Sequence, residues 1–279
     1  MTAQPPAEAL HPFVTASTWR RQATGTFATT LDEGWMQGRG AYGGLVAAGV
    51  LRSLMDAVGD ARRRPRTLDI HFCAPARPGP LHLEVNLERA GASVATWTAR
   101  GRQEDRVVCV ATAAFAFPRE GAARARFSRL PPPAAPRPEE VPPVPEDLPL
   151  MPAFARFFEY RFCVGAPPYA AGEEARLGGW IRLRAGLGEP PALDAPLVAA
   201  FIDAWPPALF SRLDAPRGAA SVNFTIDFHA ALPRDERGTH VLFSAVSQEG
   251  DGGTADEHAA LWSEDGTHLA SCRQLIAVL

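Results

Sequence analysis

The chain of 279 residues contains no lysine, so all 28 of its basic residues are arginines. Together with the many alanines and prolines, we interpret this as a bias of the coding DNA rather than a functional feature. The formal net charge is only −3, which argues against a polyanionic partner such as a nucleic acid. No apolar run reaches the ~18 residues of a transmembrane helix, and the N-terminus has no basic-then-apolar signal pattern. We therefore expect a soluble, cytoplasmic protein that does not bind a membrane.

Cysteines and histidines are also few. The four cysteines are far apart in apolar or strand-like segments, which is typical of buried thiols in a reducing compartment. The seven histidines form no His-x-x-x-His pair, so the sequence predicts no metal site and offers no obvious histidine base. A Gly-x-Ser-x-Gly motif is missing as well, which argues against a serine hydrolase.

A proline-rich segment divides the chain into two halves. Residues 119–152 contain many prolines and few large apolar side chains, so we expect a semi-rigid linker there. It separates an N-terminal domain, residues 1–118, from a C-terminal domain, residues 153–279. Apolar residues make up 46% of the chain, which is enough for a sizeable core.

The sequence pattern of each half predicts one buried helix followed by four strands. The first half has a largely apolar helix at about 44–58, and its strand-like runs are 67–72, 81–87, 94–99 and 107–117. The short, turn-rich connections between these runs indicate an antiparallel meander. In the second half, two strand-like runs at 157–163 and 180–184 precede a helix at 194–205. The four strands after it are 221–228, 241–246, 257–262 and 268–278.

The two halves repeat one another. Leu68–Phe72 matches Phe224–Phe228 at an offset of 156, and Glu104-Asp105 matches Glu264-Asp265 at an offset of 160. A helix that is apolar on every side needs a sheet that curls around it. This is the hotdog arrangement, and the sequence therefore predicts an α+β double hotdog, with two helix-wrapped antiparallel units in one chain.

Two polar residues stand alone on predicted apolar surfaces. Asp203 is the single charged residue inside the helix that Asp194 caps and Pro206 ends. Gln274 lies on a strand face with Cys272 and Ile276. A buried carboxylate must be paired, hydrogen-bonded or shifted in pKa, and a buried amide needs partners. Each residue could satisfy a structural need, or the two could meet in a catalytic site.

The glycines before the first helix permit two interpretations. Gly38-x-Gly40-x-x-Gly43 matches a dinucleotide fingerprint, and the arginines at 62–64 could face coenzyme phosphates. The fingerprint requires a parallel strand before it, however, and an antiparallel meander follows here, so we reject a dinucleotide site. Gly43 and Gly44 could instead let the backbone approach a ligand, with free N–H groups at the helix start. Tight helix packing is the alternative for these glycines, and a solvated helix end for the arginines.

The chain resembles bacterial acyl-CoA thioesterase II and its double-hotdog relatives over nearly its whole length. The resemblance rests on Tyr42-Gly43-Gly44 at the helix start, the proline-rich linker, the helix with Asp203, the strand through residues 221–229, and the ending Ala270-Ser271-Cys272-Arg273-Gln274. It implies hydrolysis of an acyl-CoA thioester, in fatty acid metabolism, with coenzyme A as part of the substrate and no metal or redox cofactor. The implied partner is the small-molecule acyl-CoA, and a homo-oligomer is compatible with the resemblance.

The resemblance also implies site residues. In the family an Asp, a Thr and a Gln orient the hydrolytic water, and these fall on Asp203, Ser221 and Gln274. Serine in place of threonine is a departure, because it keeps the hydroxyl but lacks the methyl group that restricts the rotamer. Tyr42, Gly43 and Gly44 are the expected substrate-binding residues, with N–H groups near Gly44 holding the thioester oxygen.

Strand alternation conflicts with one of these assignments. It places Ser221 and Thr225 together on the face opposite the core, so neither hydroxyl should point at Asp203. We expect a bend or bulge at the start of this strand to turn Ser221 toward the cleft. Two other functions stay open: a hotdog hydratase or dehydratase, which usually has a histidine beside the acid, and an acyl-CoA or lipid-binding protein without turnover.

Overall fold

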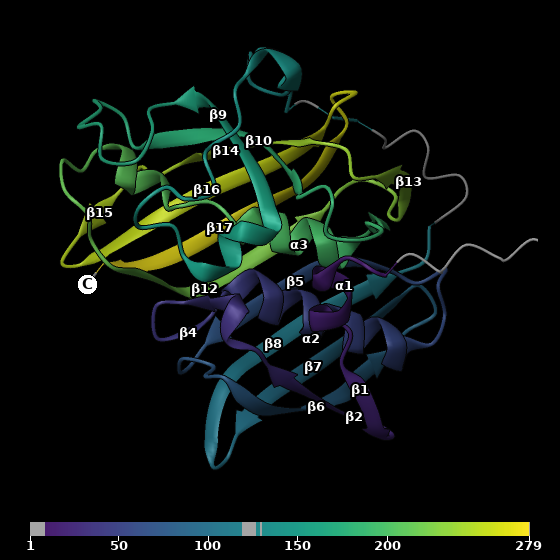
Figure 1. Ribbon diagram of the computed structural model, residues 1–279. Helices are drawn as coiled ribbons and strands as arrows, with labels where there is room; N and C mark the ends of the chain where they lie inside the picture. Colours follow the sequence, from purple (N-terminus) through teal and green to yellow (C-terminus); the bar gives the residue numbers. More distant parts are fainter. Residues whose placement is uncertain (1–8, 119–126, 129, 279) are drawn as a thin grey trace, which may run out of the picture.

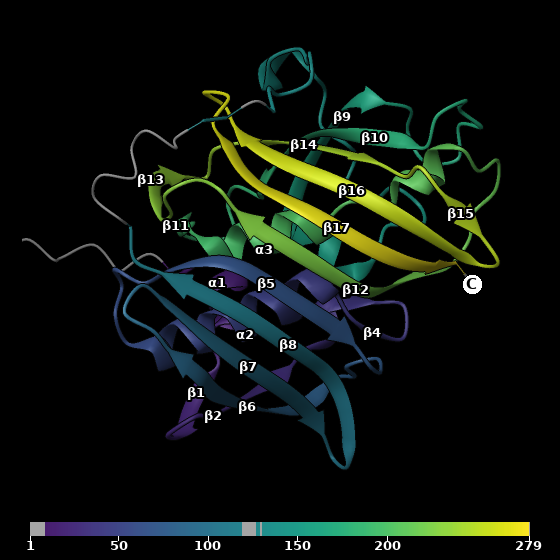
Figure 2. The ribbon, with the colours of Figure 1, turned by 180° about the vertical axis from the view of Figure 1, so that it is seen from behind.

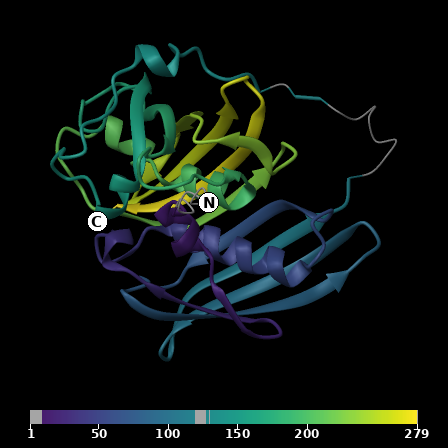
Figure 3. The same ribbon diagram turned by 45° about the vertical axis from the view of Figure 1, so that its right-hand side comes forward.

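The computed structural model describes residues 9–118, 127–128 and 130–278. Two helices, α2 (Gly43–Val58) and α3 (Ala195–Asp203), pack against each other at the centre. A curled antiparallel sheet wraps around each helix, with the N-terminal half below and the C-terminal half above in Figure 3. The α+β double-hotdog fold is confirmed.

The N-terminal half begins with a short helix and a hairpin. The helix α1 (Pro12–Ser17) comes first, and β1 (Arg20–Ala23) then turns into β2 (Thr26–Leu31) at Gly25, where φ is +74°. The 3₁₀ helix η1 (Glu33–Trp35) and a small hairpin of β3 (Met36–Gln37) and β4 (Gly40–Ala41) lead into α2. The long strands are β5 (Arg64–Phe72), β6 (Gly79–Ala90), β7 (Val94–Gln103) and β8 (Arg106–Ala116).

The C-terminal half repeats this arrangement with extra strands before its helix. These are β9 (Phe158–Gly165), β10 (Arg176–Leu183) and β11 (Ala192–Leu193). After α3 and the 3₁₀ helix η5 (Ala208–Ser211) come β12 (Ala219–Phe228), β13 (Arg234–Arg237), β14 (Val241–Val246), β15 (Gly250–Asp251), β16 (Thr254–Ser263) and β17 (His268–Val278). The predicted helices and strands are therefore present, with ends moved by a few residues.

The predicted meander is wrong at one connection. The short segment after β5 indicates pairing with β6, but β5 pairs with β8 on one side and with β12 on the other. The strand order is β1-β2-β6-β7-β8-β5 in the first half and β9-β10-β14-β16-β17-β12 in the second. Pairing between β5 and β12 joins the halves into one sheet and satisfies backbone groups along both strands, a long-range gain that local turn residues do not encode.

The two halves meet where β5 pairs with β12, and repeat-equivalent residues face each other at this seam. Asp69 and Thr225, which correspond at the offset of 156, are direct partners across β5 and β12. Thr225 Oγ1 donates a hydrogen bond to Asp69 Oδ2 at 2.6 Å. Figure 2 shows the strands on both sides of this seam running as one continuous surface. The Thr225 side chain therefore links the two halves at this seam.

Apolar side chains from both halves form one core. All nine residues of α3 are buried, as are ten residues of α2. They pack on the inner faces of the sheets, where Phe224, Ile226 and Phe228 alternate with more exposed residues along β12. In Figure 1 the two helices lie at the centre of the molecule, and each packs against the other and on strands of its own half, which explains their apolar surfaces. No helix in the described ranges is long and apolar enough to cross a membrane.

From residue 130 onward, the proline-rich linker packs on the C-terminal sheet. Trp180 Nε1 donates to the Pro136 carbonyl, and Trp262 Nε1 donates to the Leu130 carbonyl. Val141 is buried in a small second apolar cluster with both tryptophans. The linker thus contributes to packing, beyond the spacer role that its composition indicates.

Candidate active site

Asp203 is the last residue of α3, and its position depends on how the helix begins and ends. Asp194 Oδ1 accepts a hydrogen bond from the Leu197 N–H at 2.8 Å, which caps the start. The helix ends just before Trp205 and the two prolines that follow it. The side chain of Asp203 thus points into the space between the two halves and is only 8% exposed.

Three donors surround the Asp203 carboxylate. The Gly44 N–H, at the start of α2, donates to Oδ2 at 2.7 Å. Ser221 Oγ donates to Oδ1 at 3.2 Å, and Gln274 Nε2 lies 3.5 Å from the same oxygen. Gln274 Nε2 also donates to Ser221 Oγ at 2.6 Å. The three residues expected to orient the water therefore form one connected cluster.

A bulge brings Ser221 into this cluster. The register between β12 and β17 shifts between Ser221 and Asn223, as expected for the start of this strand. Beyond the bulge the strand alternates regularly, and Phe224 pairs with Gln274 on the core face. The bulge places the Ser221 hydroxyl beside Asp203, while Thr225 faces Asp69 instead.

Burial decides the electrostatics of Asp203. It raises the pKa of the carboxyl from its usual 3.8 to about 7, although the hydrogen bonds from Ser221, Gly44 and Gln274 lower it. A carboxyl with a pKa near neutral pH suits general base catalysis, because it is both available and basic enough to accept a proton from water.

A small cavity lies next to the cluster. Its water-accessible volume is about 20 Å³, which is room for one water molecule. The residues that line it include Asp203, Ser221, Gln274, Gln37 and Glu257. No histidine is among the described residues that line it. The cavity can hold one water molecule between the Asp203 carboxylate and several hydrogen-bonding groups.

At the start of α2, Tyr42 and the Gly44 N–H make contacts within the protein, where substrate contacts were expected. Tyr42 is fully buried: its hydroxyl donates to the Ala200 carbonyl and its ring stacks on Phe154 at 4.1 Å. The Gly44 N–H is bound to Asp203, so it is not free for a thioester oxygen. Gly43 has a packing role, because a Cβ there would lie 2.8 Å from Asp203 Oδ2. In the described part of the chain, the Gly43 N–H has no hydrogen-bond acceptor.

Glu257 is a wall residue that the sequence-based prediction missed. It is 5% exposed and lies on β16 with Ala255, Ala259 and Leu261 on the same buried face. This is the pattern of a lone polar group on an apolar face that drew attention to Gln274. The strand was predicted to begin at Glu257, which made this carboxylate look like an exposed strand end.

The remaining sequence features have local roles. The strands β3 and β4 before α2 are antiparallel, which agrees with rejecting the dinucleotide fingerprint. Arg62 pairs with Asp60 at 2.9 Å and is largely exposed. Arg63 donates to the Gly91 carbonyl and lies over the ring of Phe117. These two arginines therefore make contacts at the end of α2.

The other end of the helix pair is built differently. There Arg52 of α2 forms an ion pair with Asp194 of α3 at 3.1 Å. At the repeat offsets of 156 and 160, the positions that match Ser221 and Gln274 are Pro65 and Ala114. Neither carries a side-chain hydroxyl or amide, so that end cannot reproduce the Asp–Ser–Gln cluster.

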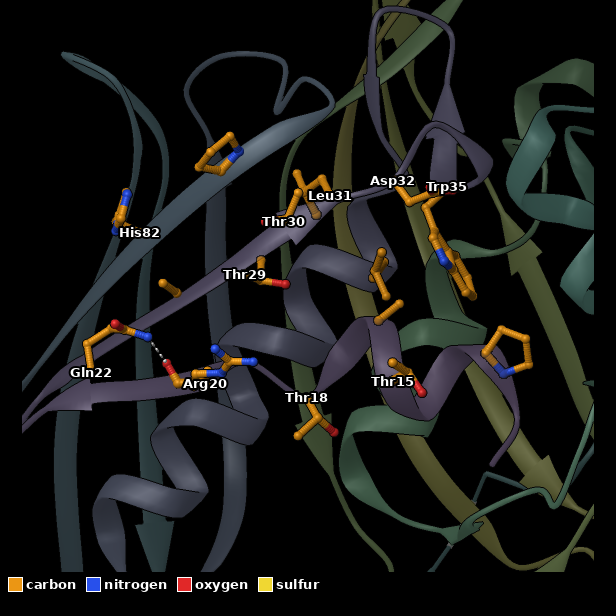
Figure 4. A pocket seen from close by; sticks show the side chains of 15 residues that line it. Thr15, Thr18, Arg20, Gln22, Thr29, Thr30, Leu31, Asp32, Trp35 and His82 are labelled. Carbon is orange, nitrogen blue, oxygen red and sulfur yellow. Dashed lines mark hydrogen bonds between the residues drawn. The ribbon is translucent and has the colours of Figure 1, made fainter. Parts of the chain in front are cut away.

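A larger pocket lies elsewhere, on the N-terminal half. It has a volume of about 560 Å³ and is lined by α1, β1, β2 and neighbouring residues. Figure 4 shows Arg20, Thr29 and His82 around it, with Trp35 at one end. It shares no lining residue with the small cavity and includes none of the predicted site residues. The small cavity beside Asp203 is therefore the candidate active site.

Solved structures of other proteins share the fold of this chain. A protein of unknown function with a hotdog fold from Alicyclobacillus acidocaldarius is 26% identical, with a TM-score of 0.86 over 96% of this chain and 98% of that one. The TesB protein of Mycobacterium avium subspecies paratuberculosis is 19% identical, with a TM-score of 0.77 over 96% and 98% of the two chains. An acyl-CoA thioesterase II from Mycobacterium marinum is 20% identical, with a TM-score of 0.69 over 96% and 98%. Curated proteins gave no match.

Family models identify both halves of the chain. Residues 31–116 match the acyl-CoA thioesterase N-terminal domain, and residues 138–278 match the acyl-CoA thioesterase C-terminal domain. The two matches together span well over half of the sequence. The chain therefore belongs to the acyl-CoA thioesterase family and is a thioester hydrolase.

Proposed function

We propose that this thioesterase cleaves acyl-CoA with a water molecule that Asp203, Ser221 and Gln274 orient. The observation that supports this most directly is a one-water cavity beside a buried carboxylate with a pKa of about 7. Ser221 and Gln274 hold the carboxylate in one orientation, while Gly44 fixes its second oxygen. Each of these groups restricts where the water oxygen can lie.

The reaction then proceeds in two steps. The water oxygen bonds to the thioester carbon, the C=O electron pair moves to the carbonyl oxygen, and the Asp203 carboxylate takes a water proton. When the tetrahedral intermediate collapses, the C–S bond breaks and the sulfur leaves with its electron pair. Asp203 returns the proton to this thiolate, which yields a carboxylic acid and the coenzyme A thiol. The Gly43 N–H is the helix-start group that we assign to the thioester oxygen, because the Gly44 N–H is already engaged.

The alternatives make different demands on the site. A hotdog hydratase or dehydratase usually has a histidine beside the acid, and no histidine is among the described residues that line the cavity. A binding protein without turnover would still bind acyl-CoA. Hydrolysis of a panel of acyl-CoA thioesters, varied in chain length and aryl content, separates these cases. Thermal stabilisation by acyl-CoA without release of thiol would favour the binding protein.

Three further expectations belong to this proposal. Hydrolysis needs no metal or redox cofactor, so a chelator should leave the rate unchanged. The protein acts on fatty acid thioesters in the cytoplasm, a location that its four free thiols support. One chain already supplies the whole site, so a homo-oligomer could form without adding residues to it.

A further inference from the structure

A second carboxyl group shares the catalytic cavity. Glu257 on β16 is the direct cross-strand partner of Gln274 on β17, so the two side chains project from the same face of the sheet. Both are buried, at 5% and 7% exposure, and both line the cavity that Asp203 and Ser221 also line. The mechanism above leaves Glu257 without a role.

Glu257 is held by a single hydrogen bond from the backbone. The N–H of Ala208, the first residue of η5, donates to Glu257 Oε2 at 2.5 Å. Oε2 is therefore an acceptor, and a proton on this carboxyl belongs on Oε1. Protonated on Oε1, the group would be a hydrogen-bond donor in a cavity that otherwise contains the base.

The surroundings decide which carboxyl carries the charge. The pKa of Glu257 is raised from 4.5 to about 7, chiefly by burial; the hydrogen bond from Ala208 lowers it, and the charges of Asp203 and Asp256 contribute to the rise. The other groups facing Glu257 are the Gln274 amide and the Cys272 thiol, both on β17. Burial raises the pKa of the Cys272 thiol well above its usual value. None of these neighbours is a cation. Asp203 has three hydrogen-bond donors and Glu257 has one, so the negative charge is more stable on Asp203.

We propose that Glu257 is a positioning residue of this thioesterase, protonated while Asp203 is ionised, whose Oε1–H donates a hydrogen bond to the water in the cavity. This water can then donate one proton toward Asp203 and keep a lone pair for the thioester carbon. A buried carboxylic acid that stays neutral in order to donate a hydrogen bond is an established device in enzymes. The inference rests on the proposed role of Asp203 as the base.

The pH dependence of kcat tests this role. The active form requires ionised Asp203 and protonated Glu257, so wild-type kcat should rise with pH through Asp203 and fall again when Glu257 ionises. In Glu257→Gln the amide oxygen can still accept from Ala208 and its NH₂ group can still donate to the water. We expect kcat near neutral pH within about 3-fold of wild type, an unchanged acid limb, and no alkaline limb.

A second variant and a control separate this role from simple packing. Glu257→Leu removes the donor while keeping the volume, and we expect kcat to fall about 10-fold or more with a KM change below about 3-fold. Glu84→Gln makes the same chemical change on an exposed position of β6 and should behave as wild type. Melting temperatures of all variants establish that the fold is kept.

Three results would overturn the inference. One is a Glu257→Gln profile with both limbs as in wild type, and another is full activity in Glu257→Leu. The third is a loss of 100-fold or more in Glu257→Gln, which would place the required charge on Glu257. Asp203→Asn, measured in parallel, distinguishes this from failure of the mechanism: an inactive Asp203→Asn with an unaltered Glu257→Gln profile rejects only the role of Glu257.

Discussion

The Gly44 N–H donates a hydrogen bond to Asp203 Oδ2 at 2.7 Å, although the two residues are 159 positions apart in the chain. Gly44 is the second residue of the helix of the first half, and Asp203 ends the helix of the second half. The candidate base is therefore aligned only when the two hotdogs have docked. This contact explains why one chain with two repeats contains a complete site.

Replacing Asp203 by Asn tests the base directly. The amide has nearly the same shape and can still accept from the Gly44 N–H and donate to Ser221, so the fold should survive. It cannot accept a proton from water, and we expect kcat to fall about 100-fold or more. Thiol release under saturating acyl-CoA measures this. Turnover at the wild-type rate would remove Asp203 from the mechanism.

The same variant should alter stability in a pH-dependent way. Burial raises the pKa of Asp203 from 3.8 to about 7, so between these values the unfolded chain is ionised while the folded protein keeps its proton. Wild-type stability thus decreases as pH rises through this window and levels off above it. We expect Asp203→Asn to be more stable than wild type at pH 8, on the order of 2 to 4 kcal/mol, with little difference near pH 4. Urea unfolding at the two pH values checks this, and an equal difference at both would contradict it.

Two hydroxyl residues on β12 should respond differently to substitution. Ser221→Ala removes a donor to Asp203 and the acceptor of Gln274, so kcat/KM should fall about 10-fold or more, near 1.4 kcal/mol. Because one donor to the carboxylate is lost, the acid limb should also move to higher pH. Ser221→Thr should retain or improve activity.

Thr225→Ala is the matched control for this pair. Its hydroxyl binds Asp69 at the seam and not the site, so activity should change little while stability falls by about 1 kcal/mol. Kinetics and unfolding of both alanine variants separate the two roles. A dispensable Ser221 together with an essential Thr225 would show that the β12 hydroxyls have been assigned the wrong way round.

The periodic spacing of apolar residues was sufficient to predict most of the fold, because a buried face requires apolar residues at regular positions in the sequence. The apolar helices, the long strands, the repeat and the lone polar groups Asp203 and Gln274 all follow from this. Pairing of β5 with β12 instead of β6 did not follow, because turn residues report only on neighbours in sequence. The Gly44–Asp203 contact requires the docked helices, and Glu257 was missed because the start of its strand was placed three residues late.

The complete cluster within one chain predicts activity without assembly. Gly44, Asp203, Ser221 and Gln274 are linked to one another without a second copy of the chain. Specific activity should therefore stay constant on dilution, including at concentrations where sizing shows only monomer. Activity restricted to a larger species would mean that a second copy completes or supports the site.

Gly43→Ala should damage the site without adding any polar group. A Cβ at this position would lie 2.8 Å from Asp203 Oδ2 and 3.1 Å from the Phe72 ring, so the carboxylate or the helix start must move. Because small misplacements of reacting groups reduce rates strongly, we expect kcat to fall about 10-fold or more. Gly250→Ala is the control, since its Cβ would meet nothing closer than 3.5 Å at an exposed position of β15. Thiol-release assays and melting temperatures of both variants give the comparison. Equal kcat in the two variants would show that the close approach of Gly43 to Asp203 is not needed for hydrolysis.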